Sequence, residues 1–489
     1  MPTGTMKKAL IIILGIIVTA ALALGLTYML LEAGPETSSQ SQIFWLILTY
    51  FSVVTFLLVV GAVQVLAGHI SFFILILAHF VWFAWPALLG LDENSRWGGA
   101  AHYDLPLHAV SKTAALMLMF LTVNVVTYWL TVRNSPHNEA VSHAREESTI
   151  EFLPLLTWIM AAFFVLGMLP YFIYGGSLAE IVSGVMASRS EIKPWSVGAH
   201  VVSESGPITV IGRSTLASFG ALALWLWLQR KKFSLHRAYS TLLLMGATVG
   251  ALVTFFDSGT RTWTLMILGA PLITVVLDRL RQKQQVKSIA IGLMLVVGAI
   301  MLTQIQLYYR LGGDLQGMET ADFVSLEDSD FFTETAIAVD LVPGQFEYIQ
   351  QFEPLLFIAN PIPRFLWQNK PFSKTVRIFS MGRSGFDEYM VTGVSRMPSI
   401  VGQHYLSWGM IGVLIAGMVW GWAFGLFERL QRSSSASSLH AFFSALGLVW
   451  LFTCSRGVYP GFHYPVLIVG LMLFLLKPSS GAQEDKNSA

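Results

Sequence analysis

The sequence predicts an all-α polytopic membrane protein, and its composition and hydropathy carry that prediction. Hydrophobic residues make up 54% of the 489 residues and charged residues only 12%, whereas roughly a quarter of a soluble domain is charged. The mean hydropathy is +0.62. The apolar residues also fall into separate stretches of about 20 residues, enough for a helix to cross a hydrocarbon core of about 30 Å. We therefore expect about twelve transmembrane helices, with a large, partly helical extracytoplasmic loop before the last three.

Each apolar stretch is expected to span the membrane once. The first follows Lys7 and Lys8 and is longer than a signal-peptide core, which favours a retained signal anchor over a cleaved signal. Nine spans are placed in residues 1–307, the loop in 308–398, three spans in 399–476 and a cytoplasmic tail in 477–489. The stretches are 8–31, 43–66, 70–91, 109–131, 151–175, 208–229, 238–256, 262–278, 288–307, 399–427, 440–455 and 461–476.

The distribution of positive charge predicts the orientation. With a cytoplasmic N terminus, lysine and arginine concentrate in the short loops that face the cytoplasm, as the positive-inside rule requires. These residues are Arg133, Arg145, Arg230, Lys231, Lys232, Arg237, Arg279, Arg281, Lys283, Lys287, Arg429 and Arg432. Three longer loops, 92–108, 176–207 and 308–398, then face outward.

The largest outer loop is divided by charge. Residues 314–353 hold ten acidic residues and no lysine or arginine, whereas residues 364–396 are mainly basic. Segments 333–340 and 346–357 could each form a short helix within the acidic half. A loop of this length is usually functional or disordered, and its aromatic content favours function.

Four arginines of the basic half are candidates for binding an anion, because topology does not require positive charge on the outer side. They are Arg364, Arg377, Arg383 and Arg396. A guanidinium is planar, stays charged and presents donors that match phosphate oxygens. The alternative is that these arginines bind lipid headgroups or pair with the acidic half of the same loop.

Three further arginines lie at or near the outer ends of spans. Arg261 follows a tight turn and should stand in the first turn of a helix, where free backbone N–H groups already favour an anion. The alternative is an ion pair between Arg261 and Asp257 that holds the turn together. Arg213, six residues into its span, would face a cavity or a partner, and Arg456 lies in the turn between the last two spans. Either could instead extend its charged end to the membrane surface.

His404 is the candidate proton acceptor, because it lies near the outer end of its expected helix with Gly409 and Gly412 close behind it. The alternative is a hydrogen-bonded core histidine, which is the interpretation adopted for His79 and His463. The single cysteine, Cys454, allows no intramolecular disulfide.

No nucleotide-binding, metallopeptidase or serine-hydrolase motif is present, so we expect neither a cofactor nor a metal. Asp328 and Asp330 form only a weak D-x-D signal. With a net charge of +1, the chain carries no global field that would favour nucleic acid.

Three segments carry a family resemblance. Residues 360–371, NPIPRFLWQNKP, followed by 399–412, SIVGQHYLSWGMIG, resemble the oligosaccharide repeat unit polymerases, the Wzy-type O-antigen polymerases. Residues 258–265, SGTRTWTL, are similar to the R-x-x-x-L segment of the related O-antigen ligases, and His404 with Gly412 is similar to their H-x7-G pattern.

The resemblance implies a glycosyltransferase of the bacterial inner membrane that acts at its periplasmic face. It would join undecaprenyl-pyrophosphate-linked repeat units into O-antigen or a related surface polysaccharide. Arg261, Arg364 and Arg383 would stabilise the developing phosphate charge. His404 would accept the proton of the acceptor hydroxyl, with an acidic residue of the loop as the alternative base. Arg213, Arg377, Arg396 and Arg456 would help to bind substrate, with the rings of Trp367 and Tyr389 stacking on sugars.

Lipid-linked glycans and membrane lipids are the expected partners, and the family leaves room for a chain-length regulator. An O-antigen ligase would differ only in its acceptor. A flippase or transporter of lipid-linked oligosaccharide would need a charged central cavity, whereas the spans here are nearly uncharged. A structural or sensory protein whose loop binds a partner would not explain the basic half of the loop.

Overall fold

The computed structural model describes helices and short connections, with no strand in the described part of the chain. The description covers residues 40–66, 69–90, 105–133, 153–186, 207–258, 261–282, 298, 301, 330–351, 356–359, 362, 366–369, 371, 373–384, 397–433, 438–458 and 460–475. Eight of its helices are long and apolar enough to cross a membrane. The chain is therefore a polytopic membrane protein.

Ten described elements coincide with ten of the expected spans, two of them as shorter apolar helices. They are α2 (Gln40–Leu66), α3 (Ile70–His79) with η1 (Phe80–Ala84) and α4 (Trp85–Leu89), α5 (Leu107–Arg133), α7 (Leu153–Tyr174), α9 (Pro207–Leu228), α10 (Arg237–Ser258), α11 (Arg261–Arg281), α18 (Ser399–Ser433), α19 (Ser438–Cys454) and α20 (Tyr464–Leu475). The first expected span lies outside the described residues, as does nearly all of the ninth. Shorter elements are α8 (Leu178–Met186), α14 (Phe331–Leu341), α15 (Leu356–Ala359), α16 (Lys374–Ser384) and η6 (Pro460–His463).

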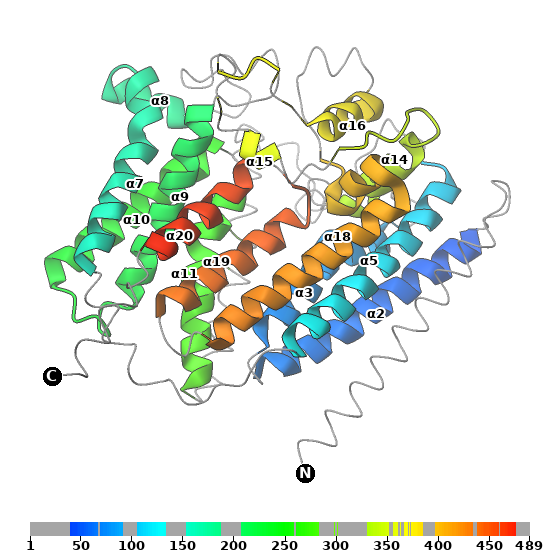
Figure 1. Cartoon of the computed structure of the whole chain (residues 1–489), viewed down its shortest axis with the longest axis horizontal. Coiled ribbons are helices and arrows are strands. Elements are labelled where there is room, and N and C mark those ends of the chain that lie inside the picture. Colours follow the sequence, from blue (N-terminus) through cyan, green and yellow to red (C-terminus); the bar gives the residue numbers. More distant parts are fainter. Residues whose placement is uncertain are drawn as a thin grey trace, which may run out of the picture.

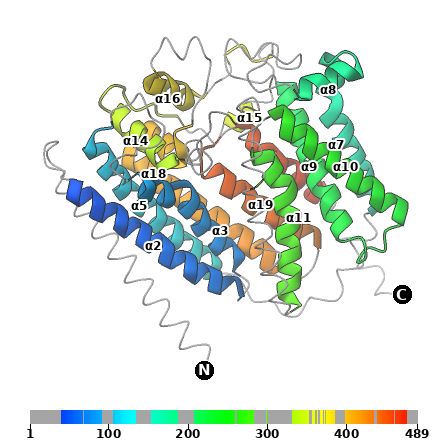
Figure 2. The same cartoon turned by 180° about the vertical axis from the view of Figure 1, so that it is seen from behind.

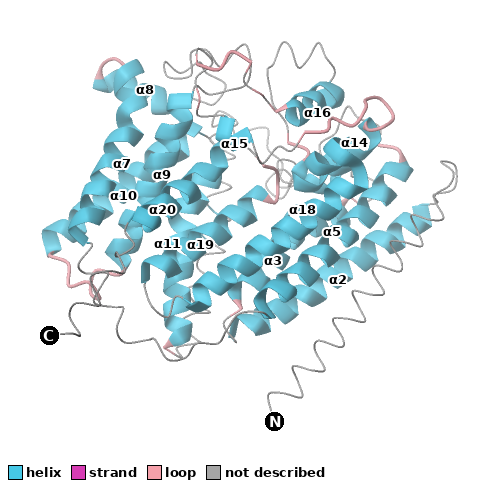
Figure 3. Ribbon diagram, in the orientation of Figure 1, coloured by secondary structure: helices cyan, strands magenta, loops and turns pink. Residues whose placement is uncertain are grey.

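The long helices form two groups that meet along α19 (Figures 1 and 2). On one side α2, α3, α5 and α18 pack together, and on the other α9 packs against α7, α10 and α11. Figure 3 shows the short helices α8, α14, α15 and α16 gathered at one end of the bundle. The structure thus collects these short helices, which lie in the loops 176–207 and 308–398, at one end of the spans.

Small residues bring α18 and α5 close together. Gly417, Gly421 and Gly425 recur every four residues on α18, and a Cβ on Gly421 would collide with the backbone of Asn124 on α5. Small residues at this spacing allow helix backbones to approach in a membrane, where packing replaces the hydrophobic effect as the driving force. The second half of α18 is therefore held close to α5 by a tightly packed helix pair.

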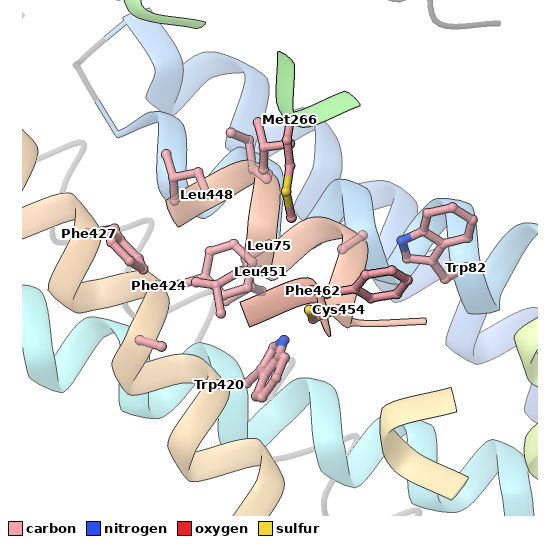
Figure 4. Close-up of a cluster of buried hydrophobic side chains, with 14 of the residues drawn as sticks. Leu75, Trp82, Met266, Trp420, Phe424, Phe427, Leu448, Leu451, Cys454 and Phe462 are labelled. Carbon is pink, nitrogen blue, oxygen red and sulfur yellow. The ribbon is translucent and has the colours of Figure 1, made fainter. Parts of the chain in front are cut away.

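Aromatic side chains fill the core between the two groups (Figure 4). Trp82 and Trp420 are nearly buried, and each indole N–H has a partner. Trp82 Nε1 donates to the Phe452 carbonyl at 2.9 Å, and Trp420 Nε1 donates to Ser455 Oγ at 3.2 Å. Because Ser455 begins the turn after α19, this core supports the turn that carries Arg456.

The C-terminal end of α18 carries a buried carboxylate. Glu428 is fully buried and lies 3.1 Å from Arg432 Nε and 3.3 Å from His69 Nδ1. Its second oxygen accepts a hydrogen bond from the Ser71 backbone N–H at 3.2 Å, in the first turn of α3. A carboxylate at a helix N terminus satisfies unpaired N–H groups. Glu428 therefore ties the connection between α2 and α3 to α18.

One expected helix is confirmed and another is wrong. The expected helix at 333–340 is α14, which begins after Asp330, whose Oδ1 accepts the Thr333 N–H at 2.9 Å. The expected helix at 346–357 does not form over its first six residues, and only the four-residue α15 is helical beyond them among the described residues. Gln350 has a φ of 54°, which interrupts a right-handed helix.

A break in α18 explains this failure. Trp408 and Gly409 leave helical geometry, and Gly409 has a φ of 59°. The carbonyls of the preceding turn accept bonds from the loop instead: Ile349 N–H donates to Leu406 O and Gln350 N–H to Ser407 O, both at 3.0 Å. Tertiary hydrogen bonds thus replace the local ones that a helix would need.

Candidate functional site

The first turn of α18 is joined to α14 through hydroxyl groups. Ser399 is fully buried, and its Oγ accepts the Gly402 N–H at 3.0 Å, which caps the helix. The same oxygen lies 2.6 Å from Thr335 Oγ1 of α14. The turn that leads to His404 is therefore fixed against the described helix of the acidic half-loop.

The next turn of α18 is joined to the connection that carries Arg456. Gln403 Nε2 donates to the Val458 carbonyl at 3.1 Å, and the Val458 N–H donates to Gln403 Oε1 at 2.7 Å. The side chain of Gln403 is fully buried, so both of its polar ends are satisfied inside the protein. Gln403, which directly precedes His404, thus fixes the turn after α19 to α18.

Aromatic contacts extend this connection to the start of α11. The Arg456 guanidinium lies over the Phe462 ring at 5.9 Å, and Phe462 meets Trp263 edge-on at 5.7 Å. Arg261 is the first residue of α11, as its position after the tight turn predicted, and it stands two residues before Trp263. The side chain of Arg261 lies outside the described part.

Arg383 of α16 pairs with Glu334 of α14. Its Nε lies 2.9 Å from Glu334 Oε2, and both side chains are 10% exposed. The sequence left two interpretations of Arg383 open, anion binding and pairing with the acidic half of the same loop. The contact with Glu334 is the second of these. Burial raises the pKa of the nearby Asp330 above its usual range, while hydrogen bonds from Thr333 and the charge of Arg383 oppose that rise. Arg383 therefore acts on Glu334 of α14 and on Asp330, which caps that helix.

His404 is buried within α18. Its side chain approaches the carbonyl of Ile400 through Nδ1, at 2.8 Å. A carbonyl oxygen only accepts, so Nδ1 carries the proton and Nε2 keeps its lone pair. This tautomer fits a proton acceptor, but the ring is only 4% exposed, as a core histidine would be.

Lys112 and two tyrosines border the break in α18. Lys112 of α5 lies 5.4 Å from the centre of the Tyr405 ring, and Tyr405 packs edge-on against Tyr348 at 6.1 Å. Tyr348 also covers Gly409, where a Cβ would come within 3.0 Å of the Tyr348 hydroxyl. The break is thus enclosed by a cation and two rings.

The remaining predicted site residues fall into two sets. Arg213 is partly buried in α9, which packs against η6, while Arg377 is exposed on α16 and Trp367 is 40% exposed in the turn at 366–369. Arg364, Arg396 and Tyr389 lie outside the described residues. The elements that carry five of the predicted residues contact one another in a continuous series. These residues are Arg213, Arg261, Arg383, His404 and Arg456.

Sequence reasoning missed Gln403, Glu334 and Lys112. Lys112 carried a signal like the one that selected Arg213, a charge inside an apolar stretch near its start. Gln403 and Glu334 gave no such signal, because their importance comes from partners that are 55 and 49 positions away in the chain. Within the described ranges, no three His, Cys, Asp or Glu side chains are placed to hold a metal ion.

Comparison with protein-family models, curated proteins and solved structures finds no match to this chain.

Proposed function

We propose that this protein is a membrane glycosyltransferase that polymerises undecaprenyl-pyrophosphate-linked oligosaccharide repeat units at the outer face of a bacterial inner membrane. One observation carries the proposal: the first turns of α18 are bonded both to the turn that contains Arg456 and to α14, whose Glu334 pairs with Arg383. Gln403 makes the first connection and Ser399 the second. Two cationic residues from distant parts of the chain are thus linked to the first turns of the helix of His404, Arg456 through its turn and Arg383 through Glu334.

The proposed reaction needs stabilisation of negative charge. A repeat-unit glycan leaves its undecaprenyl pyrophosphate as the hydroxyl of an acceptor sugar attacks the anomeric carbon. The C–O bond to pyrophosphate breaks, a glycosidic C–O bond forms and the hydroxyl proton passes to a base. Fixed guanidinium groups stabilise the departing pyrophosphate without reorganisation. Arg261, Arg364 and Arg383 are assigned this role, with Arg213, Arg377, Arg396 and Arg456 binding substrate and Trp367 and Tyr389 stacking on sugars.

The pairing of Arg383 with Glu334 is compatible with this role. The contact involves Nε, and a guanidinium has further N–H donors on its two Nη atoms. The carboxylate of Glu334 lies against Nε, so the Nη groups are the donors assigned to phosphate oxygens. Glu334 is therefore a positioning residue for Arg383.

The proposed base is His404 through Nε2, because its Nδ1–H faces the Ile400 carbonyl. Proton transfer by a positioned histidine contributes roughly 10²–10⁴-fold to a rate. Replacement of His404 by glutamine keeps the hydrogen bond to Ile400 within reach and removes the basic nitrogen.

The test uses the purified full chain in detergent with lipid-pyrophosphate-linked repeat units as the only substrate. Without added nucleotide, we expect a ladder of glycans, and Arg383→Ala should slow its growth by about 10²–10³-fold. His404→Gln should slow it by about 10²-fold or more. Exposed residues at other places serve as matched controls: Arg133→Ala and His440→Gln should leave the ladder unchanged.

Other product patterns would reject the polymerase. A single transfer of glycan to a lipid core acceptor would indicate a ligase, and movement of intact lipid-linked units across vesicles without elongation would indicate a flippase. Equal loss of the ladder in Arg133→Ala and Arg383→Ala would remove the assigned role of Arg383.

A further inference from the structure

The connection between α9 and α10 forms an open hollow of about 460 Å³. It lies at the end of the bundle opposite α14 and α16 (Figures 1 and 2), and therefore far from the candidate site. Its lining includes Trp227, Arg230, Lys231, Arg237 and Ser240. By the positive-inside rule, this connection faces the cytoplasm.

The hollow is strongly cationic, with Arg230, Lys231 and Arg237 in its lining. Arg230 stacks on the Trp227 ring at 4.3 Å, and its Nη1 donates to the Trp227 carbonyl at 3.0 Å. Lys231 and Arg237 are exposed at its edge. In the described part of the chain, no carboxylate forms an ion pair with any of these three cations. Such a concave group of donors is suited to a phosphate.

An apolar surface continues from the hollow along α10. Leu242 is 65% exposed and Met245 is 60% exposed, both within the first turns after Arg237. These side chains belong to a candidate membrane span, so they face lipid tails. Trp227 adds an indole at the level where aromatic side chains prefer the membrane interface. A ligand with a phosphate and acyl chains would satisfy both parts of this surface.

We propose that this hollow binds the phosphate headgroup of an anionic phospholipid from the cytoplasmic leaflet, with an acyl chain lying along α10. Arg230 would be the preorganised ligand, because stacking on Trp227 already fixes its guanidinium. Lys231 and Arg237 would supply attraction at the rim. This site is independent of the proposed glycan chemistry at the other end of the bundle.

The test is native mass spectrometry of the full chain in detergent with phosphatidylglycerol, cardiolipin or phosphatidylcholine added. We expect retention of the anionic lipids over phosphatidylcholine, and a loss of roughly fivefold in affinity for each of Arg230→Gln and Arg237→Gln. Lys232→Gln is the matched control, since Lys232 lies in the same connection but does not line the hollow. Arg237 is exposed, so its replacement should not disturb folding.

Three results would overturn the proposal. They are equal retention of phosphatidylcholine, an effect of Lys232→Gln as large as that of Arg237→Gln, and release of the bound lipid by millimolar inorganic phosphate. The last result would show that the hollow recognises free phosphate and that the apolar surface of α10 contributes nothing.

Discussion

Removing either partner of the Arg383–Glu334 pair should destabilise the protein strongly. At 2.9 Å the attraction is about 6 kcal/mol with an effective dielectric constant of about 20, before the cost of desolvation is subtracted. Both side chains are only 10% exposed, so a single substitution removes the opposite charge at this contact from a group that is shielded from water. We expect Glu334→Gln and Arg383→Gln each to lower the free energy of unfolding by about 3–5 kcal/mol.

The double substitution should recover much of this loss. With both charges removed, no ion remains unpaired, and two glutamines of similar volume can hydrogen-bond to each other. We expect the double variant to cost about 2 kcal/mol less than the sum of the single variants. The double variant also separates stability from chemistry: we expect it to remain folded and still to build the glycan ladder about 10²–10³-fold more slowly.

The single cysteine provides the assay. Cys454 is fully buried beside the turn of Arg456, so a thiol-reactive fluorophore reports its exposure during thermal unfolding in detergent. Asp340→Asn serves as the control, because Asp340 lies 3.9 Å from a half-exposed His108 and should contribute less than about 1 kcal/mol. Strictly additive losses in the double variant would refute a coupled buried pair, and normal ladder growth by that variant would refute the chemical role of Arg383.

Two further predictions concern the break in α18 and the start of α14. Gly409→Ala should cost about 1–3 kcal/mol in thermal unfolding, because its φ is 59° and a Cβ would crowd Tyr348; Gly298→Ala, where a Cβ meets nothing within 4 Å, should be nearly neutral. Burial raises the pKa of Asp330 above its ordinary 3.8, so its contribution to stability is complete below that value and is lost as the pH rises through the raised pKa. Asp330→Asn keeps an acceptor for the Thr333 N–H but removes the titrating group. It should therefore abolish the loss of stability as the pH rises through the pKa of Asp330, measured by tryptophan fluorescence during unfolding. A pH profile of stability equal to that of the unaltered protein would contradict this role of Asp330.

Predictions that depended on local sequence agreed with the structure. The stretch containing Arg213 begins as a helix at Pro207, Arg261 opens α11, and Arg456 lies between α19 and η6. Each follows from the length of an apolar run and from the residues that interrupt it. The helix expected at 346–357 was wrong because its N–H groups bond to Leu406 and Ser407, which no local pattern reveals.

The sequence by itself determined the class of protein, the position of ten described membrane-crossing or apolar helices and the charge division of the outer loop. Those features depend on hydropathy and charge, which neighbouring residues carry together along the chain. Only the tertiary structure decided that Gln403 joins the Arg456 turn, that Glu334 takes Arg383 as its partner and that α18 breaks at Gly409. The physical reason is that a buried hydrogen bond or ion pair needs two groups within about 3 Å, and packing of distant helices alone sets that separation.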